Sequence, residues 1–190
     1  MPASGLHGVH DIPLGSHLCS FYRQPEEFLG MSASFLRAGL SNHEACIWIL
    51  PSAMTLESAL HELSQHGVDG MQVQATQQLQ IVSAHDCYFS TSLFDVDGAL
   101  NWLVSLFAMA RQLGYRNARI AGGLGPFLSE ETRRAFMRYE QHATEVIARH
   151  RGIGLCCYPS PLCLSATEMF DIMSTHPKAL LRTHNGWATV

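Results

Sequence analysis

The chain is 190 residues long, carries a formal net charge of −4, and is 47% hydrophobic with only 15% charged residues. This length suffices for one domain with a sizeable core. The charge balance lacks the basic footprint of proteins that bind nucleic acid or anionic membranes. The longest apolar runs, such as 45–50 and 103–110, are too short to span a bilayer, and no secretory signal is visible. We therefore predict a cytoplasmic protein without direct contact to nucleic acid or membrane.

The first fourteen residues are rich in glycine, proline and histidine and show no hydrophobic periodicity. They predict a flexible leader over 1–14, followed by a single domain over 15–190. Taken in chain order, we predict a strand at 18–22, a helix at 25–40, a strand at 45–50, a helix at 55–66, a strand at 79–82, a polar loop at 83–92, a helix at 95–113, a strand at 118–121, a helix at 129–150, a strand at 153–158, a helix at 165–174, and a C-terminal β-hairpin at 179–190. This alternation predicts a three-layer α/β fold, with a mainly parallel sheet and helices on both faces.

The turn after the first predicted strand lacks the chemistry of a phosphate loop. It reads Arg-Gln-Pro-Glu-Glu over 23–27, where a phosphate loop would carry glycines, a lysine and a serine or threonine. Pro25 removes an N–H donor, and Glu26 and Glu27 already occupy the positive end of the helix dipole. The glycine-rich segment 122–126 is likewise not followed by lysine or serine at the required spacing. The sequence therefore argues against ATP binding.

The six cysteines contain no C-x-x-C pair, and without a secretory signal we predict that they are reduced. His17 and Cys19 are two residues apart on a predicted strand, so they share a face. With Cys156 or Cys157 from another strand and His176 after the last helix, they could form a tetrahedral metal site. In the alternative reading, the cysteines fill the core and His17 caps a strand end. No other cofactor is predicted.

Arginines and tyrosines near strand ends are candidate ligand contacts, because open α/β sheets bind ligands beyond the carboxyl ends of their strands. Arg23 and Arg119 could anchor an anionic group, although Arg23 could equally pair with Glu26 or Glu27 at the surface. Aromatic side chains could wall an apolar cavity. The complete predicted ligand set is His17, Cys19, Tyr22, Arg23, Arg119, Tyr158 and His176. The alternative metal set is His17, Cys19, Cys156 and His176.

An ordered series of short segments carries a family resemblance. The segments are His17-Leu-Cys19-Ser-Phe21-Tyr22, Phe35-Leu-Arg-Ala-Gly39-Leu, Glu44-Ala-Cys-Ile-Trp-Ile-Leu, Gly67-Val-Asp69, Leu79-Gln-Ile-Val, Phe94-Asp95, Gly114-Tyr115-Arg-Asn-Ala-Arg119-Ile, Tyr139-Glu140, Leu155-Cys156-Cys-Tyr158 and Ser174-Thr-His176-Pro177. Together they resemble the MEDS sensory domain, named after methanogens, methylotrophs and a dichloromethane-responsive repressor. The resemblance covers roughly residues 15–182. It extends to RecA/KaiC-type ATPases, with the phosphate loop lost.

The resemblance implies a bacterial or archaeal signalling sensor that binds a small molecule, such as a hydrocarbon derivative. The signal would pass to a regulatory partner or output domain, in transcription regulation or a two-component system. One departure is that Gly122-Gly123-Leu124 stands where the family tends to have Gly-Glu-Met, so an expected pocket carboxylate is absent.

Three readings of the function remain open at this point. The first is a non-enzymatic sensor that binds its small ligand at the carboxyl edge of the sheet. The second is a metal- or redox-responsive Cys/His switch. The third is a ligand-free interaction module in a signalling complex. The terminal hairpin would supply an edge strand that could pair with a second copy, so a homodimer is also predicted. We predict no enzymatic activity.

Overall fold

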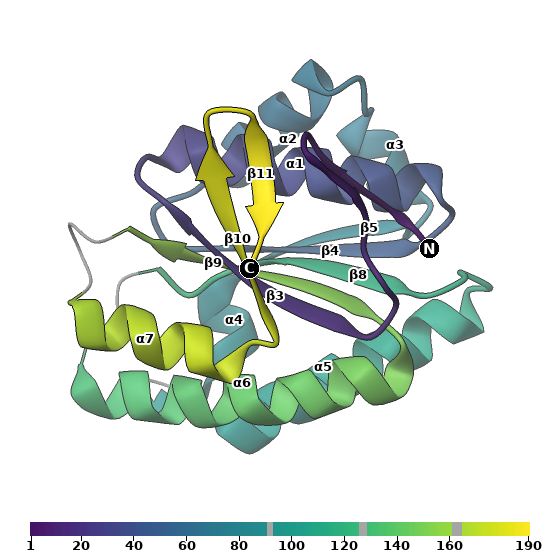
Figure 1. The fold of residues 1–190 in the computed structure, drawn as a ribbon. Helices are drawn as coiled ribbons and strands as arrows, with labels where there is room; N and C mark the ends of the chain where they lie inside the picture. The colour runs from purple at the N-terminus through teal and green to yellow at the C-terminus, as the bar shows by residue number, and fades with distance from the viewer. Residues whose placement is uncertain (91–92, 126–128, 161–164) are drawn as a thin grey trace.

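A central sheet of seven strands organises the computed structural model, which describes residues 1–90, 93–125, 129–160 and 165–190 (Figure 1). The strands are β3 (Ser16–Tyr22), β4 (Ala45–Leu50), β5 (Leu79–Ser83), β8 (Ala118–Gly122), β9 (Ile153–Pro159), β10 (Lys178–Thr183) and β11 (Gly186–Thr189). Their order across the sheet is β11-β10-β3-β9-β8-β4-β5. All neighbours run parallel except β10 and β11, which form the predicted C-terminal hairpin. The predicted mainly parallel sheet is confirmed.

Helices cover both faces of the sheet, as predicted (Figure 1). One face carries α1 (Pro25–Ser41), α2 (Leu56–Gln65) and α3 (Gly70–Ala75), and the other carries α4 (Ala84–Tyr88), α5 (Val96–Gln112), α6 (Glu130–His150) and α7 (Ala166–Thr175). Ser129 and Ser165 cap α6 and α7 by accepting backbone N–H bonds, because a serine oxygen can replace the missing helical acceptor. Among the described residues, no helix has the length and apolar character needed to cross a membrane.

The core lies on both sides of β4, which is buried at every position. Trp48 belongs to the apolar cluster under α1, with its ring 6.4 Å from that of Phe28. Ile47 and Ile49 belong to the cluster under α5 and α6. A strand that is apolar on both faces needs such cover on both sides. This explains why the continuous run 45–50 predicted its strand correctly.

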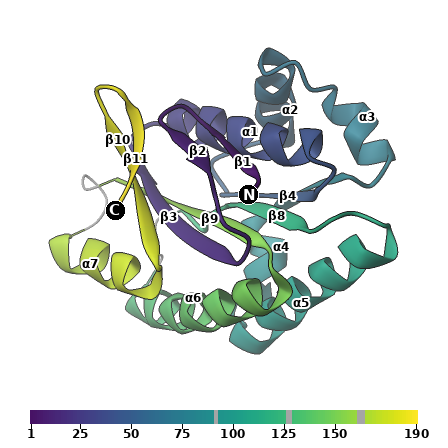
Figure 2. The ribbon, with the colours of Figure 1, turned by 45° about the vertical axis from the view of Figure 1, so that its right-hand side comes forward.

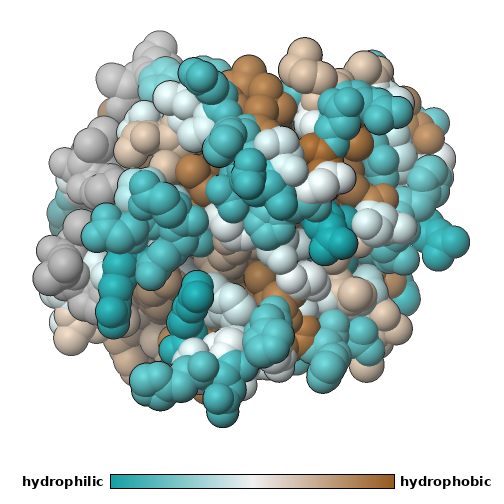
Figure 3. All heavy atoms as spheres, turned by 90° about the horizontal axis from the view of Figure 1, so that it is seen from above, coloured by the Kyte–Doolittle hydropathy of each residue, from teal (hydrophilic) through white to brown (hydrophobic). Residues whose placement is uncertain are grey.

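The predicted flexible leader is wrong, because the chain begins with an ordered hairpin of β1 (Ala3–Leu6) and β2 (Val9–Asp11). Leu6, Val9 and Ile12 are buried against α1, and the His7 carbonyl accepts a bond from the Trp187 backbone N–H (2.7 Å). Figure 2 shows the hairpin lying along α1. Figure 3, which views the molecule from above Figure 1, shows a mostly hydrophilic face with small separate apolar areas. The sequence did not predict this hairpin because its three buried apolar side chains do not form a helical or strand-like pattern.

The predicted polar loop 83–92 is also wrong in part. Ser83 caps the short helix α4, and strand β6 (Phe89–Ser90) pairs with β7 (Leu93–Phe94). Tyr88 is buried, and its ring stacks 5.7 Å from that of Phe94. The polar residues on the exposed side of α4 led to the loop prediction, so the sequence did not reveal that the tyrosine is buried. Residues 91–92 lie outside the described part of the chain.

The glycine-rich segment at the end of β8 allows close packing against β9. Only its residues up to 125 are described, since 126–128 lie outside the described part of the chain. A Cβ added to Gly123 would collide with the carbonyl oxygen of Cys157 on the neighbouring strand. We therefore expect Gly123→Ala to lower the free energy of unfolding by about 1–3 kcal/mol in urea denaturation, the usual range for overpacking. The control is Gly30→Ala in α1, where the nearest atom lies 3.4 Å away. Equal stability of both variants would contradict the packing role of Gly123.

Candidate functional site

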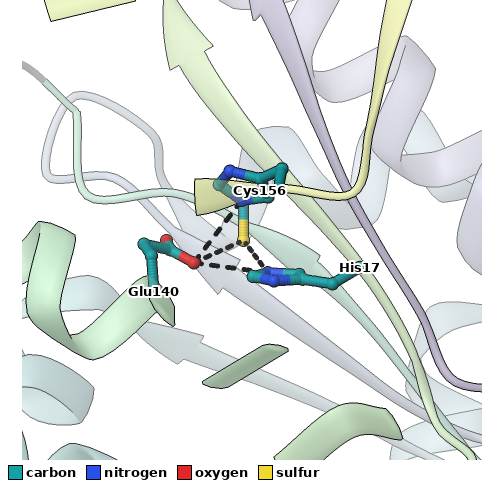
Figure 4. A group of neighbouring side chains, drawn as sticks. His17, Glu140 and Cys156 are labelled. Atoms are coloured by element: carbon teal, nitrogen blue, oxygen red, sulfur yellow. Dashed lines mark hydrogen bonds and ion pairs between the residues drawn. The ribbon is translucent and has the colours of Figure 1, made fainter. Parts of the chain in front are cut away.

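Four side chains of kinds that can bind a metal ion meet on the α6 and α7 side of the sheet. They are His17 from β3, Glu140 from α6, Cys156 from β9 and His176, the residue that ends α7. Each offers one ligand atom, and these atoms all lie within 4.8 Å of one another. We call these four residues the polar cluster. Figure 4 shows the side chains of His17, Glu140 and Cys156 pointing toward one another.

The strand arrangement explains how the cluster forms. β3 and β9 are parallel neighbours, so alternate residues of both strands face α6. Gly154 lies beside His17 in the register, and a Cβ at that position would approach the His17 ring to 3.0 Å. The absent side chain therefore leaves room for the imidazole.

The distances within the polar cluster are short. His17 Nε2 lies 3.1 Å from Cys156 Sγ and 3.2 Å from Glu140 Oε2. His176 Nε2 lies 3.5 Å from the same carboxylate oxygen, and Cys156 Sγ lies 3.6 Å from it. Glu140 Oε2 is thus the common neighbour of the three other ligand atoms.

Hydrogen bonds outside the cluster fix which ring nitrogen of each histidine carries a proton. The Thr144 hydroxyl donates to backbone carbonyls, so it must accept from His17 Nδ1–H, at 2.7 Å. His176 Nδ1 faces the Ile172 carbonyl at 2.8 Å and must also donate. Both Nδ1 atoms are therefore protonated, and both Nε2 atoms turn toward the carboxylate.

The carboxylate of Glu140 is fixed in the same way. The Tyr158 hydroxyl donates to Oε1 at 2.8 Å, which leaves Oε2 for the cluster. Glu140 and His176 have completely buried side chains, and that of His17 is 1% exposed. Cys156 is the one member that is only half-buried.

Burial and the neighbouring side chains shift the pKa values of the cluster. It lowers the pKa of His17, and together with the Glu140 charge it raises the pKa of the Cys156 thiol well above its usual value. Burial alone would raise the pKa of Glu140, but the interactions of its carboxylate with the His17 and His176 imidazoles outweigh burial and lower that pKa. These two shifts favour an ionised carboxylate beside a protonated thiol.

The structure brings together three members of the predicted ligand set, His17, Tyr158 and His176. Cys156, from the alternative metal set, joins them. Cys19 lies two residues after His17 on β3, beside Cys156 in the register, where burial raises its pKa to about 12, and its sulfur is not among the four ligand atoms. Glu140 takes that fourth place.

Sequence reasoning did not select Glu140 as a site residue. The available signal was the Tyr139-Glu140 pair within the family resemblance, and a carboxylate on the buried stripe of an amphipathic helix.

Tyr22 and Arg23 lie away from the cluster. Tyr22 is buried on the opposite face of the sheet, with its ring 5.4 Å from that of Phe28. Arg23 is exposed, and its backbone N–H donates to Glu27 Oε2 at 2.7 Å. The Glu27 carboxylate thus accepts the hydrogen bond of a backbone N–H group in this turn. A phosphate loop would use such N–H groups to bind its anion.

Arg119 is not an anchor at the carboxyl edge, so that prediction is wrong. It is the second residue of β8, at the amino end of the strand, and is completely buried. Its Nε donates to Glu44 Oε2 at 2.6 Å, and Nη1 donates to the carbonyls of Phe35 (2.9 Å) and Ala3 (3.0 Å). The strand predicted at 118–121 already has this arginine near its amino end; the sequence could not show its burial against Glu44.

Comparison with known proteins places this fold and these residues in a wider group. A KaiC-like protein from the hyperthermophilic archaeon Pyrococcus horikoshii OT3 superposes with a TM-score of 0.66 at 13% identity, covering 99% of this chain and 85% of that chain. The match establishes a shared RecA/KaiC-like fold. No curated protein matches the sequence. The sequence profile of MEDS, the methanogen/methylotroph, DcmR sensory domain, matches residues 16–177, which include the whole polar cluster. The chain therefore belongs to the MEDS sensory-domain family.

Proposed function

We propose that this chain is a non-enzymatic signalling sensor that binds its ligand at the polar cluster and relays binding through α7 to a partner or output domain. The observation that carries the proposal is the position of His176. This residue is a cluster member, ends α7, and stands two residues before β10. A change at the cluster would therefore reach both the helix and a strand near the sheet edge.

The chemistry around the cluster argues against catalysis. Cys156 and His17 are close enough for a nucleophile and a base, but burial raises the pKa of the thiol, which disfavours the reactive thiolate. In a triad the acid would orient the base through its other nitrogen, whereas Glu140 faces the same Nε2 as the thiol. Cys87 is buried as well, and burial raises its pKa to about 12.

The size of the cluster argues for a very small ligand. Ligand atoms within 4.8 Å of one another leave room for an ion but not for a hydrocarbon derivative. Binding of an organic molecule at the carboxyl edge of the sheet stays a prediction, and residues 126–128 and 161–164 lie outside the described part of the chain. The homodimer through the C-terminal hairpin and a location in the cytoplasm also stay predictions.

The relay surface that we propose is the outer side of α7. Phe170 is 73% exposed there, and Met173 is 37% exposed on the same helix. A partner or output domain that contacts these side chains would respond to a change in the local stability of α7.

Hydrogen exchange followed by mass spectrometry tests this relay. Glu140→Gln keeps the shape of the side chain but removes the charge that His17 and His176 share, so we expect exchange to rise at least about tenfold in α7 and β10. β4 and β5 should be unchanged. The control is Glu145→Gln, an exposed position on the same helix.

The signalling role needs a readout in the native host. A chromosomal Glu140→Gln replacement should change the regulated transcripts or phosphorylation, whereas Glu145→Gln should leave them unchanged. Exchange that rises evenly over the whole sheet would show a purely structural carboxylate, and would contradict the relay.

A further inference from the structure

We propose that the polar cluster binds one divalent transition-metal ion with tetrahedral preference, zinc foremost. The ligands would be His17 Nε2, His176 Nε2, Cys156 Sγ and Glu140 Oε2. The proposal deepens the proposed function, because it names the ligand of the same site. It rests on three independent properties of the cluster: its spacing, its lone pairs and its charge.

The spacing matches a tetrahedral ion. Ligands bound to zinc at about 2.0–2.3 Å lie about 3.3–3.7 Å from one another in a tetrahedron. Four of the six distances between the ligand atoms run from 3.1 Å to 3.6 Å, and the other two, from His176 Nε2 to His17 Nε2 and to Cys156 Sγ, lie within 4.8 Å. An ion at the centre therefore requires His176 to move inward by up to about 1 Å.

The lone pairs of both histidines point inward. Each Nδ1 proton is used by an acceptor outside the cluster, Thr144 for His17 and the Ile172 carbonyl for His176. This arrangement is the usual outer support of metal-bound histidines, because it fixes the tautomer and the ring orientation. Within the described part of the chain, His176 Nε2 is buried and has no hydrogen-bond partner. The Nε2 lone pair of each histidine faces the negatively charged Glu140 carboxylate. This arrangement is repulsive unless a proton or a metal ion lies between the nitrogen and oxygen atoms.

The charges also balance. One carboxylate, one thiolate and two neutral imidazoles neutralise a divalent cation, so the loaded site carries no net charge in the core. An isolated buried carboxylate is costly, and it must be paired or bind a metal. A bound ion would displace the proton of the Cys156 thiol, because cysteine binds a metal as its thiolate.

The donor set selects the class of metal. Calcium and magnesium prefer oxygen ligands in larger numbers, whereas two imidazoles and a thiolate suit zinc and its neighbours. Four protein ligands leave no open coordination position, which is the pattern of an ion that is held rather than one that reacts.

Cobalt(II) titration of the reduced, chelator-treated full chain tests the proposal, because tetrahedral cobalt thiolates have strong visible bands and a near-ultraviolet charge-transfer band. We expect both bands to saturate at one ion per chain and to disappear when zinc is added. Cys156→Ser should lose the charge-transfer band and bind more than about 100-fold more weakly, which exceeds the usual effect of an outer partner.

Two further variants keep the test decisive. Cys157→Ser changes the next residue of the same strand, which packs in the other core cluster, so its spectrum should match the wild type. Tyr158→Phe keeps all four ligands but removes the bond to Glu140 Oε1, so it should keep the spectrum and bind about tenfold more weakly. Tyr158→Phe remains informative if Cys156→Ser does not fold.

A weak octahedral spectrum, or equal binding by the wild type and Cys156→Ser, would overturn the metal site. A retained organic mass without metal in native mass spectrometry would overturn it too. If metal binding fails while the exchange response of α7 to Glu140→Gln persists, only the metal inference falls. If the metal binds and α7 does not respond, the site stands without its signalling role.

Discussion

Replacing Arg119 with methionine is expected to lower the free energy of unfolding by about 3–5 kcal/mol, the usual loss when one partner of a buried ion pair is removed. Arg119 and Glu44 are both completely buried, and Arg119→Met leaves the Glu44 carboxylate without its counter-ion. The variant also loses the bonds to Ala3 and Phe35, which hold the N-terminal hairpin and α1 together. Urea denaturation followed by circular dichroism measures the change.

The nearby Arg116→Met serves as the control, since Arg116 is exposed and such surface changes stay within about 0.5 kcal/mol. Combining Arg119→Met with Glu44→Leu should cost less than the sum of the single changes, because no unpaired charge remains. A loss below about 1 kcal/mol for Arg119→Met would mean that water reaches Glu44 and replaces the pair.

Zinc is expected to raise the free energy of unfolding of the wild type by about 4 kcal/mol when its free concentration is a thousand times its dissociation constant. The gain follows from our metal proposal, because the four ligands come from β3, α6, β9 and the end of α7 and converge only in the folded chain. Urea denaturation in zinc buffers, with and without a chelator, measures it.

Cys157→Ser should gain as much from zinc as the wild type, and Cys156→Ser should gain much less at the same free zinc concentration. An equal gain in both variants would place the ion elsewhere, for instance on surface histidines, of which the chain has a good supply among its 11.

The elements that the sequence predicted well are those whose burial shows in their own residues. The run 45–50 is apolar at every position, and its strand has the predicted bounds. Ser129 and Ser165 mark their helix starts because capping is a local interaction. The N-terminal hairpin escaped prediction because its order depends on α1 and β11, which lie elsewhere in the chain.

The candidate site could be predicted only in part, for the same physical reason. His17 and Cys19 share a face, as their spacing predicted, but which one reaches the cluster depends on what α6 and α7 place above them. Glu140 lies on a helix rich in charged residues, where carboxylates are normally exposed. Its burial follows from the meeting of β3, β9 and α7, and no local pattern encodes that meeting.

The N-terminal hairpin also affects how this molecule meets its own copies. β11 ends the sheet, and an open sheet edge invites foreign strands and aggregation. Here the turn at His7 and Gly8 lies against Gly186 and Trp187 and takes up one edge N–H group. A second copy would have to displace this turn before it could add a strand at β11. We therefore expect the N-terminal turn to hinder the homodimer that the C-terminal hairpin predicts.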